Sequence, residues 1–119
     1  MNKYTEEELE DHRELWCQAL ESGEYPQTCG RLQNLGGYCC LGVACDVAEK
    51  HGIAVKRDEG ILIGGNLLAM PEVLEWLGLQ DGKGEMEYGR SLANMNDITR
   101  LSFPEIAGVI RSKPDGLFI

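Results

Sequence analysis

Two adjacent cysteines, Cys39 and Cys40, come directly before a segment that is typical of a helix, where a thiol could act as a nucleophile. The N-terminal end of a helix lowers the pKa of a thiol and so favours the reactive thiolate. Cysteine catalysis also needs a base within hydrogen-bond reach. His51 stands at the far end of the same predicted helix, about 14 Å away at 1.5 Å per residue, which leaves His12 as the base. An enzyme that uses Cys40 is therefore one hypothesis, and we favour thiols that fill space in the core.

The spacing of the cysteines does not favour a metal site. Structural zinc sites use closely spaced thiolate pairs such as Cys-x-x-Cys, and this chain contains no such pair. The cysteines are Cys17, Cys29, Cys39, Cys40 and Cys45. Their number is odd and two are adjacent, whereas secreted scaffolds usually pair their thiols. We therefore expect reduced cysteines, no metal ion and no other cofactor, and a reducing cytoplasm as the location.

One carboxylate, Asp46, interrupts a helix predicted over residues 41–50 that is otherwise small and apolar. A carboxylate in such a helix needs a partner, because an unpaired buried charge is costly. Arg31, in the hairpin predicted before this helix, is the expected partner. A structural ion pair is the favoured hypothesis for Asp46, and a ligand-binding role is the alternative.

The basic side chains predict a second kind of site, a pocket for a nucleotide-like ligand. Such a pocket would gather arginines and a lysine from distant parts of the chain, at the interface of a homo-oligomer. Two polar residues that end a predicted helix, Asn96 and Asp97, are added to this set, although such residues more often cap turns. The predicted ligand-binding residues are Arg31, Asp46, Lys56, Arg57, Arg90, Asn96, Asp97 and Arg100. No catalytic residue is predicted.

The net charge of −9 is unevenly distributed along the 119 residues. Residues 1–24 and residues 58–88 each carry a net charge of −6, whereas residues 25–57 carry +2 and residues 89–119 carry +1. Binding to duplex nucleic acid depends on a basic surface that releases counterions. The charge pattern therefore excludes a duplex partner. It fits either solubility or a basic surface on a partner protein, bound by the first helix and residues 72–87.

The hydropathy pattern predicts no membrane partner. No apolar run approaches the roughly 20 residues that span a bilayer, and the first eight residues lack the apolar stretch of a secretion signal. We expect the chain to stay in the cytoplasm in which it is made.

Helix signals occur at five places in the chain. Thr5 and Glu8 form a capping box for a first helix that ends at Gly23, and Ser102 and Glu105 form another. The remaining predicted helices are residues 41–50, residues 71–77 before Gly78, and a short one that starts at Ser91. The helix over residues 41–50 has few polar positions, which is typical of the most buried helix of a domain.

Short strands are predicted between these helices. Residues 31–34 and 38–40 would form one hairpin, residues 53–55 and 61–63 a second, and residues 86–88 a single strand. The predicted fold class is α+β, as a single small domain over residues 1–119. It would have about five short helices around a central buried helix, with one or two short β-hairpins.

The order of several segments resembles a family of small proteins encoded by tailed bacteriophages and prophages. The most specific part is Tyr38-Cys39-Cys40-Leu41-Gly42-Val43, followed by Cys45-Asp46 and Ala48. The other segments are Trp16 with Ala19-Leu20, Pro71 with Trp76-Leu77-Gly78-Leu79, Leu92-Ala93 with Asn96-Asp97, and Ser102-Phe103 with Glu105-Ile106-Ala107. Met95 departs from the leucine more usual before Asn-Asp in that family, a conservative core change. The resemblance implies a phage context and a bacterial host, and no particular reaction.

The leading hypothesis is a phage-encoded, acidic, non-enzymatic binding protein that acts in the host cytoplasm, with counter-defence as one role. It would either block a host protein or sequester a small nucleotide-like host signal. One alternative is the enzyme that uses Cys40. Another is a structural or accessory protein of the virion.

Overall fold

Helix α2, Cys40–Lys50, is the buried centre of the structure, as its small apolar residues predict. The computed structural model describes residues 3–119. Within them the other α-helices are α1 Glu6–Glu21, α3 Pro71–Leu77, α4 Leu92–Asp97 and α5 Phe103–Ser112, with short 3-10 helices at η1 Leu67–Ala69 and η2 Glu87–Gly89. The strands are β1 Gln33–Asn34, β2 Gly37–Tyr38, β3 Arg57–Asp58 and β4 Ile61–Leu62. The predicted α+β fold class, five helices with two short hairpins, is confirmed.

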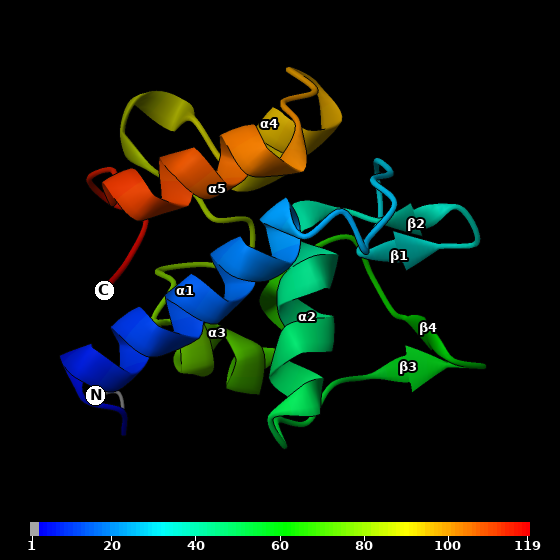
Figure 1. Cartoon of the computed structure of the whole chain (residues 1–119), viewed down its shortest axis with the longest axis horizontal. Coiled ribbons are helices and arrows are strands. Elements are labelled where there is room, and N and C mark those ends of the chain that lie inside the picture. The colour runs from blue at the N-terminus through cyan, green and yellow to red at the C-terminus, as the bar shows by residue number, and fades with distance from the viewer. Residues whose placement is uncertain (1–2) are drawn as a thin grey trace.

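The helices pack around α2 and α1. Helix α1 contacts α5, α2 and α3, and α2 also contacts α4. Figure 1 shows α4 and α5 at one end of the molecule, with α1 between α5 and α3. The two hairpins lie together at one side of the molecule (Figure 1), where β1 contacts β4. The edge of α4 and the hairpins are therefore two separate surfaces.

Local sequence signals set the helix starts. Thr5 and Glu8 form the predicted capping box of α1, and Ser102 and Glu105 form that of α5. Each box satisfies free backbone amides at the first turn. Ser91 accepts a hydrogen bond from the Asn94 amide and so begins α4. Within residues 3–119, no helix combines the length and the apolar character that crossing a bilayer requires.

The first hairpin is shorter than its prediction. Gln33 pairs with Tyr38 and Asn34 with Gly37. Cys39 does not continue the strand, because it is the N-cap of α2 and its Sγ accepts a hydrogen bond from the Gly42 amide. The predicted position of the hairpin is correct, and its second strand ends before the predicted residues 39–40.

The prediction of residues 53–55 as the first strand of the second hairpin is wrong. β3 pairs with β4 through Arg57–Leu62 and Asp58–Ile61. The two residues between these strands, Glu59 and Gly60, have φ angles of 50° and 83°, as a tight type I′ hairpin turn requires. The Ile53 amide instead donates to the Ala48 oxygen and closes the end of α2.

The predicted strand over residues 86–88 is also wrong. The chain makes the 3-10 turn η2 there, because Tyr88 has a φ of 63° and Gly89 a φ of 71°. The Met86 amide donates to the Arg90 oxygen at 2.8 Å and closes the turn. Tyr88 is thereby presented on a tight, backbone-strained loop.

The C-terminal residues pack onto the end of α3. Leu117 is buried, and the Ile119 amide donates to the Gly78 oxygen at 2.8 Å. The guanidinium of Arg13 lies 3.8 Å from the centre of the Phe118 ring. Gly78 has a φ of 70°, and a Cβ there would lie 2.6 Å from the Arg13 Nη2 atom. Glycine is therefore required at the end of α3 for its backbone angle and for the buried arginine beside it.

Candidate functional site

Asp46 is the centre of a network of charged side chains between α2 and the β3–β4 hairpin. Nη2 of Arg57 donates to Asp46 Oδ1 at 3.1 Å and to Glu49 Oε1 at 2.9 Å. The prediction that Asp46 forms an ion pair is confirmed, but the predicted partner, Arg31, is wrong. The hairpin folds back along α2, and its first strand places Arg57 against the carboxylate.

The second oxygen of Asp46 is occupied as well. Tyr25 donates its hydroxyl hydrogen to Asp46 Oδ2, and Lys50 Nζ lies 3.3 Å from the same oxygen. Burial of the Tyr25 ring and the hydrogen bond to Asp46 raise the pKa of Tyr25 to about 12. The tyrosine is therefore a neutral hydrogen-bond donor at physiological pH.

The guanidinium of Arg57 is fully used inside the molecule. Nε donates to Glu49, and Nη1 donates to Gln33 Oε1 at 3.0 Å and to the Gly60 oxygen at 2.7 Å. Nη2 donates to Asp46 and Glu49. All three nitrogens thus have partners, and an anionic ligand would have to displace carboxylates to reach them.

A pocket of about 450 Å³ opens beside this network. Its lining is Arg31, Arg57, Asp58, Ile61, Leu62 and Ile63. The structure therefore brings two predicted ligand-binding arginines together, with Lys56 next to Arg57 in the sequence. Of the two arginines, the exposed Arg31 is available, because Arg57 is committed to its carboxylates.

Asn96 is buried, with 1% of its surface exposed, and it joins three parts of the chain. Its Oδ1 accepts from the Cys40 amide at 3.2 Å and from Gln27 Nε2 at 2.9 Å. Its Nδ2 donates to the Thr28 oxygen at 2.7 Å and to Asp97 Oδ1 at 2.8 Å. These bonds hold the start of α2 against α4, so the predicted ligand residue has a structural role.

A second pocket, here called the α4 groove, has a volume of about 380 Å³. It is lined by Gly89, Arg90, Ser91, Asn94, Met95, Ile98, Thr99 and Leu101. Arg90 is a predicted ligand-binding residue, and Arg100 stands between the lining residues Thr99 and Leu101. Arg31 and Arg57 thus line one pocket and Arg90 lines another, whereas Lys56 and Arg100 are chain neighbours of lining residues.

Large apolar side chains are exposed at the α4 groove. Ile98 is 74% exposed and lines it, and Tyr88, which precedes the lining residue Gly89, is 89% exposed. Arg100 has a φ of 59°, and its side chain makes no hydrogen bond or ion pair with residues 3–119. The only ion pair of Arg90 within the same residues is with Glu87, at 4.0 Å. The groove therefore combines the exposed Ile98 with the lightly engaged Arg90, and Arg100 follows the lining residue Thr99 in the chain.

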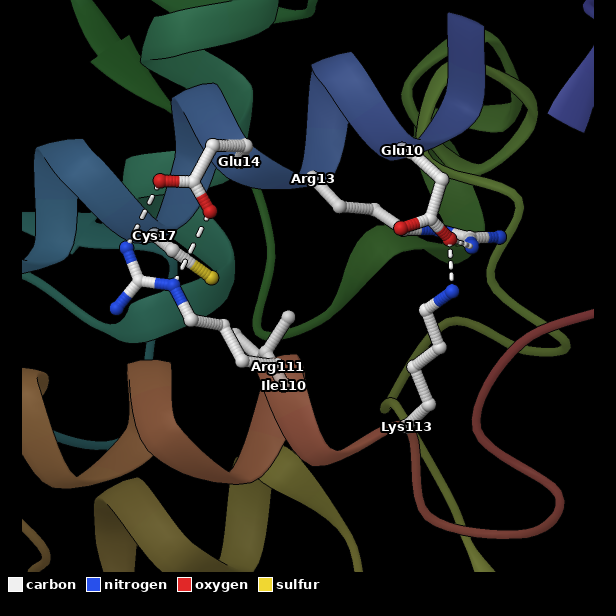
Figure 2. Close-up of a pocket in the computed structure, with 7 residues that line it drawn as sticks. All are labelled: Glu10, Arg13, Glu14, Cys17, Ile110, Arg111 and Lys113. Atoms are coloured by element: carbon white, nitrogen blue, oxygen red, sulfur yellow. Dashed lines mark hydrogen bonds and ion pairs between the residues drawn. The ribbon is translucent and has the colours of Figure 1, made fainter. Parts of the chain in front are cut away.

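A third pocket, of about 260 Å³, lies between α1 and α5 and is crossed by ion pairs. Figure 2 shows Arg111 of α5 reaching Glu14 of α1, and Lys113 reaching Glu10, with Cys17 and Ile110 beside them. Arg111 Nη2 lies 3.0 Å from Glu14 Oε2. These pairs join two helices. They also engage part of the acidic block of α1 that was predicted to face a partner.

The cysteines do not form a reactive site in the described structure. Cys40 is completely buried, and its Sγ donates to the Leu92 oxygen at 3.6 Å. Burial raises the pKa of Cys40 well above its usual value and outweighs the effect of the helix start that was predicted to lower it. Cys17, Cys39 and Cys45 are also buried, whereas Cys29 is exposed. Within residues 3–119, no three His, Cys, Asp or Glu side chains are placed to share a metal ion.

The charge pattern of the sequence predicted Arg90 and Arg100 as ligand-binding residues, but the exposed apolar residues near them, Ile98 and Tyr88, were not predicted. Ile98 follows the last turn of α4 and is succeeded by the polar pair Thr99-Arg100, which is a weak signal of an exposed apolar side chain. Tyr88 was assigned to a strand. Its positive φ, which presents it outward, is not evident from its residue type.

A family model described as a domain of unknown function (DUF8296) matches residues 9–114. This range contains every residue that lines the α4 groove and the pocket beside Arg57. No match to the chain was found among curated proteins or among solved structures.

Proposed function

The chain belongs to the family described as a domain of unknown function (DUF8296), and we propose that it is a phage-encoded, non-enzymatic binding protein that blocks a protein of the bacterial host. Its place of action would be the host cytoplasm, and its target a component of host defence. The resemblance of the Tyr38–Ala48 segment to phage proteins supports the phage origin. The binding function is supported by the chain's own surface.

The α4 groove is the observation that carries this proposal. Aromatic residues, methionine and arginine are enriched at the centres of protein interfaces, and lysine and glutamate are depleted there. The lining has this composition, with Arg90, Met95 and Ile98 and no lysine or glutamate, and the exposed Tyr88 and Arg100 are chain neighbours of lining residues. Exposed apolar surface framed by arginines is typical of a protein-docking site.

The thiols argue against the cysteine-enzyme alternative. A nucleophilic cysteine is accessible and has a lowered pKa. Cys40 is buried, and its pKa is raised.

The nucleotide-sequestering alternative has one supporting observation, the exposed Arg31 at the pocket beside Arg57. We favour protein binding because Arg57, the other cation of that pocket, has all its nitrogens engaged. A panel of cyclic and ADP-ribose-type nucleotides near saturation tests the alternative. A ligand that raises the melting temperature of the wild type but not of Arg31→Ala would establish it over protein blocking.

The proposal is tested by a photo-crosslinking amino acid placed at Ile98 in the full chain, expressed in bacteria. The matched control places the same crosslinker at Leu68, which is 71% exposed compared with 74% for Ile98 and lies outside the α4 groove. We expect a discrete crosslinked host protein from position 98 and none from position 68. Equal crosslinking at both positions, or none at 98, would contradict a docking role for the groove.

During phage infection the same reagent separates host blocking from the virion alternative. A crosslink from position 98 to a particle protein, together with co-purification with particles, would replace the host-blocking proposal with the structural one.

A further inference from the structure

We propose that the α4 groove selects an acidic partner segment that inserts one apolar side chain between flanking carboxylates, an inference that rests on the proposed function. The segment would place its apolar side chain against Met95, Ile98 and Leu101. Its carboxylates would pair with Arg90 and Arg100. This assignment differs from the charge pattern of the whole chain, which favours basic partners.

The apolar part of the site is open to an incoming side chain. Met95 lies at the base with little exposure, Leu101 is half-buried, and Ile98 is largely exposed. A partner side chain placed against these three would remove apolar surface from water, which is the main favourable term in association. The volume of about 380 Å³ is within the range of pockets that hold compact groups.

The charges at the groove favour carboxylates. The Arg100 side chain has no hydrogen bond or ion pair within residues 3–119, and Arg90 has only the 4.0 Å contact with Glu87. Asp97, the nearby acid on α4, accepts a hydrogen bond from the buried Asn96 amide. A guanidinium donates two parallel N–H hydrogen bonds to a carboxylate, so each arginine can bind one carboxylate of the partner.

The acidic side chains of α1 repel the carboxylates of such a partner less strongly than the net charge of −9 suggests. Glu14 and Glu21 pair with Arg111, and Glu10 pairs with Lys113. Each such pair neutralises part of the acidic field that would repel a carboxylate. Charges farther away than about 8 Å are also screened at physiological ionic strength.

Arg100 is one of four non-glycine residues with a positive φ within residues 3–119, together with Glu59, Tyr88 and Lys113. With a φ of 59°, it occupies the left-handed region just after α4, where glycine is the favoured residue. An arginine there makes the fold less stable than a glycine would.

Three hexapeptides test the chemistry on the full chain, with binding followed by the NMR amide shifts of residues 88–101. The first has a phenylalanine at position three with aspartates on both sides, the second has the same phenylalanine with lysines on both sides, and the third has a serine in its place with aspartates on both sides. We expect the first to bind about tenfold more tightly than the other two, with an affinity that falls as salt rises. Equal binding of the first two would overturn the charge assignment, and equal binding of the first and third would overturn the apolar one.

Charge reversal sharpens the test. In the Arg90→Glu, Arg100→Glu double variant, the preference should invert, so that the lysine-flanked peptide binds better. Arg31→Glu changes an exposed arginine at the other pocket and should leave the preference unchanged. Because both arginines of the groove are exposed, the double variant is expected to fold, which its amide spectrum would verify. A preference that survives the reversal, or concentration-dependent self-association through the same amides, would overturn the proposal.

The same double variant separates this inference from the proposed function. If the crosslink from position 98 to a host protein persists in the double variant, the docking function stands and the acidic selection fails. If the wild type gives no host crosslink but shows the peptide preference, the proposed function fails and the chemistry of the groove stands.

Discussion

The two surfaces that carry the predicted ligand-binding residues differ in how their charges are used. At the side of α2, Asp46 and Arg57 direct their polar atoms toward each other and toward Glu49, Gln33 and Tyr25. At the edge of α4, Arg100 has no partner within residues 3–119, and Ile98 beside it is largely exposed. At the first surface the charged side chains have hydrogen-bond partners within the chain. At the second, an arginine with no hydrogen bond or ion pair among the described residues stands next to exposed apolar surface.

This difference shows that charge alone does not identify a binding site. Arg57 and Arg100 are equivalent in the sequence, since both are arginines outside the predicted helices. In the structure, Arg57 holds the hairpin against α2, and the Arg100 side chain makes no hydrogen bond or ion pair within residues 3–119. Substitutions at the two surfaces should therefore have different effects on the free energy of unfolding.

The largest effect is expected for Gly42→Ala, which disturbs the helix that carries the complete network. A Cβ at Gly42 would lie 1.8 Å from the Leu32 oxygen, so α2 would have to move away from the first hairpin. We expect a loss of about 3 kcal/mol or more in urea unfolding.

Gly89→Ala is the matched change at the α4 groove. No atom lies within 4 Å of a Cβ at Gly89, and its φ is 71°, so backbone strain of about 1 kcal/mol is the expected cost. Equal losses for the two alanine variants would contradict the difference between the two surfaces.

Arg57→Ala should give the next largest effect. It leaves Asp46 and Glu49 without their shared guanidinium, and removes the donor to Gln33. We expect a loss of about 2 kcal/mol, since Oδ1 of the largely buried Asp46 and Oε1 of Gln33 lose their donor, while Tyr25 and Lys50 still hold the other oxygen of Asp46. Arg100→Ala removes no interaction within residues 3–119 and should change stability by less than about 0.5 kcal/mol. A similar loss for both variants in chemical denaturation would show that Arg100 is also part of the fold.

Arg100→Gly should stabilise the chain while weakening partner binding. Glycine adopts the φ of 59° found at this residue at lower cost than arginine, and the expected gain is about 0.5 to 1 kcal/mol. The melting temperature should rise by a few degrees. Glu59→Gly is the control, because Glu59 also has a positive φ, of 50°, but lies in the turn of the second hairpin, outside the α4 groove, so it should be stabilised in the same way without a change in binding. A loss of stability in Arg100→Gly would contradict the assignment of strain at the groove.

The smallest expected effect is a dependence of stability on pH at Tyr25, which is confined to alkaline solution. Its pKa is raised from 10 to about 12 in the folded chain, so the folded state holds the hydroxyl proton more tightly than the unfolded state. The resulting stability is fully present below pH 10 and is lost as the pH rises toward 12. Thermal unfolding across this range should show the decline in the wild type and a smaller one in Tyr25→Phe. If stability declines equally in the wild type and in Tyr25→Phe, Tyr25 is not the group that causes the decline.

Local signals in the sequence predicted the helix starts and the buried helix correctly. Thr5 with Glu8 and Ser102 with Glu105 act within one turn of helix, so their roles do not depend on the rest of the fold. The second strand of the second hairpin was predicted correctly, but its first strand was placed too early, because the turn depends on Glu59 in the left-handed region, which glutamate rarely adopts. The end of α2 also takes the Ile53 amide that the predicted strand needed.

The candidate site was only partly predictable, because exposure is a property of the folded chain. The sequence singled out Asp46 correctly, since a lone carboxylate in an apolar helix needs a partner. Which arginine supplies it depends on how the second hairpin folds against α2. That the Arg100 side chain has no partner within residues 3–119 and that Ile98 is exposed both follow from the packing of α4 on α2 and α5. No local sequence pattern encodes that packing.

Of the five thiols, only that of Cys29 is exposed, and its Sγ lies 3.4 Å from the backbone oxygen of Asn96 on α4. Burial raises the pKa of Cys17 and Cys45 to about 12 and that of Cys39 to about 11, and Cys40 is shifted in the same direction. A maleimide fluorophore should therefore attach at one position in the native chain, without any cysteine being added or removed. The label would stand next to the helix that lines the groove, where its emission could report the arrival of a partner in real time.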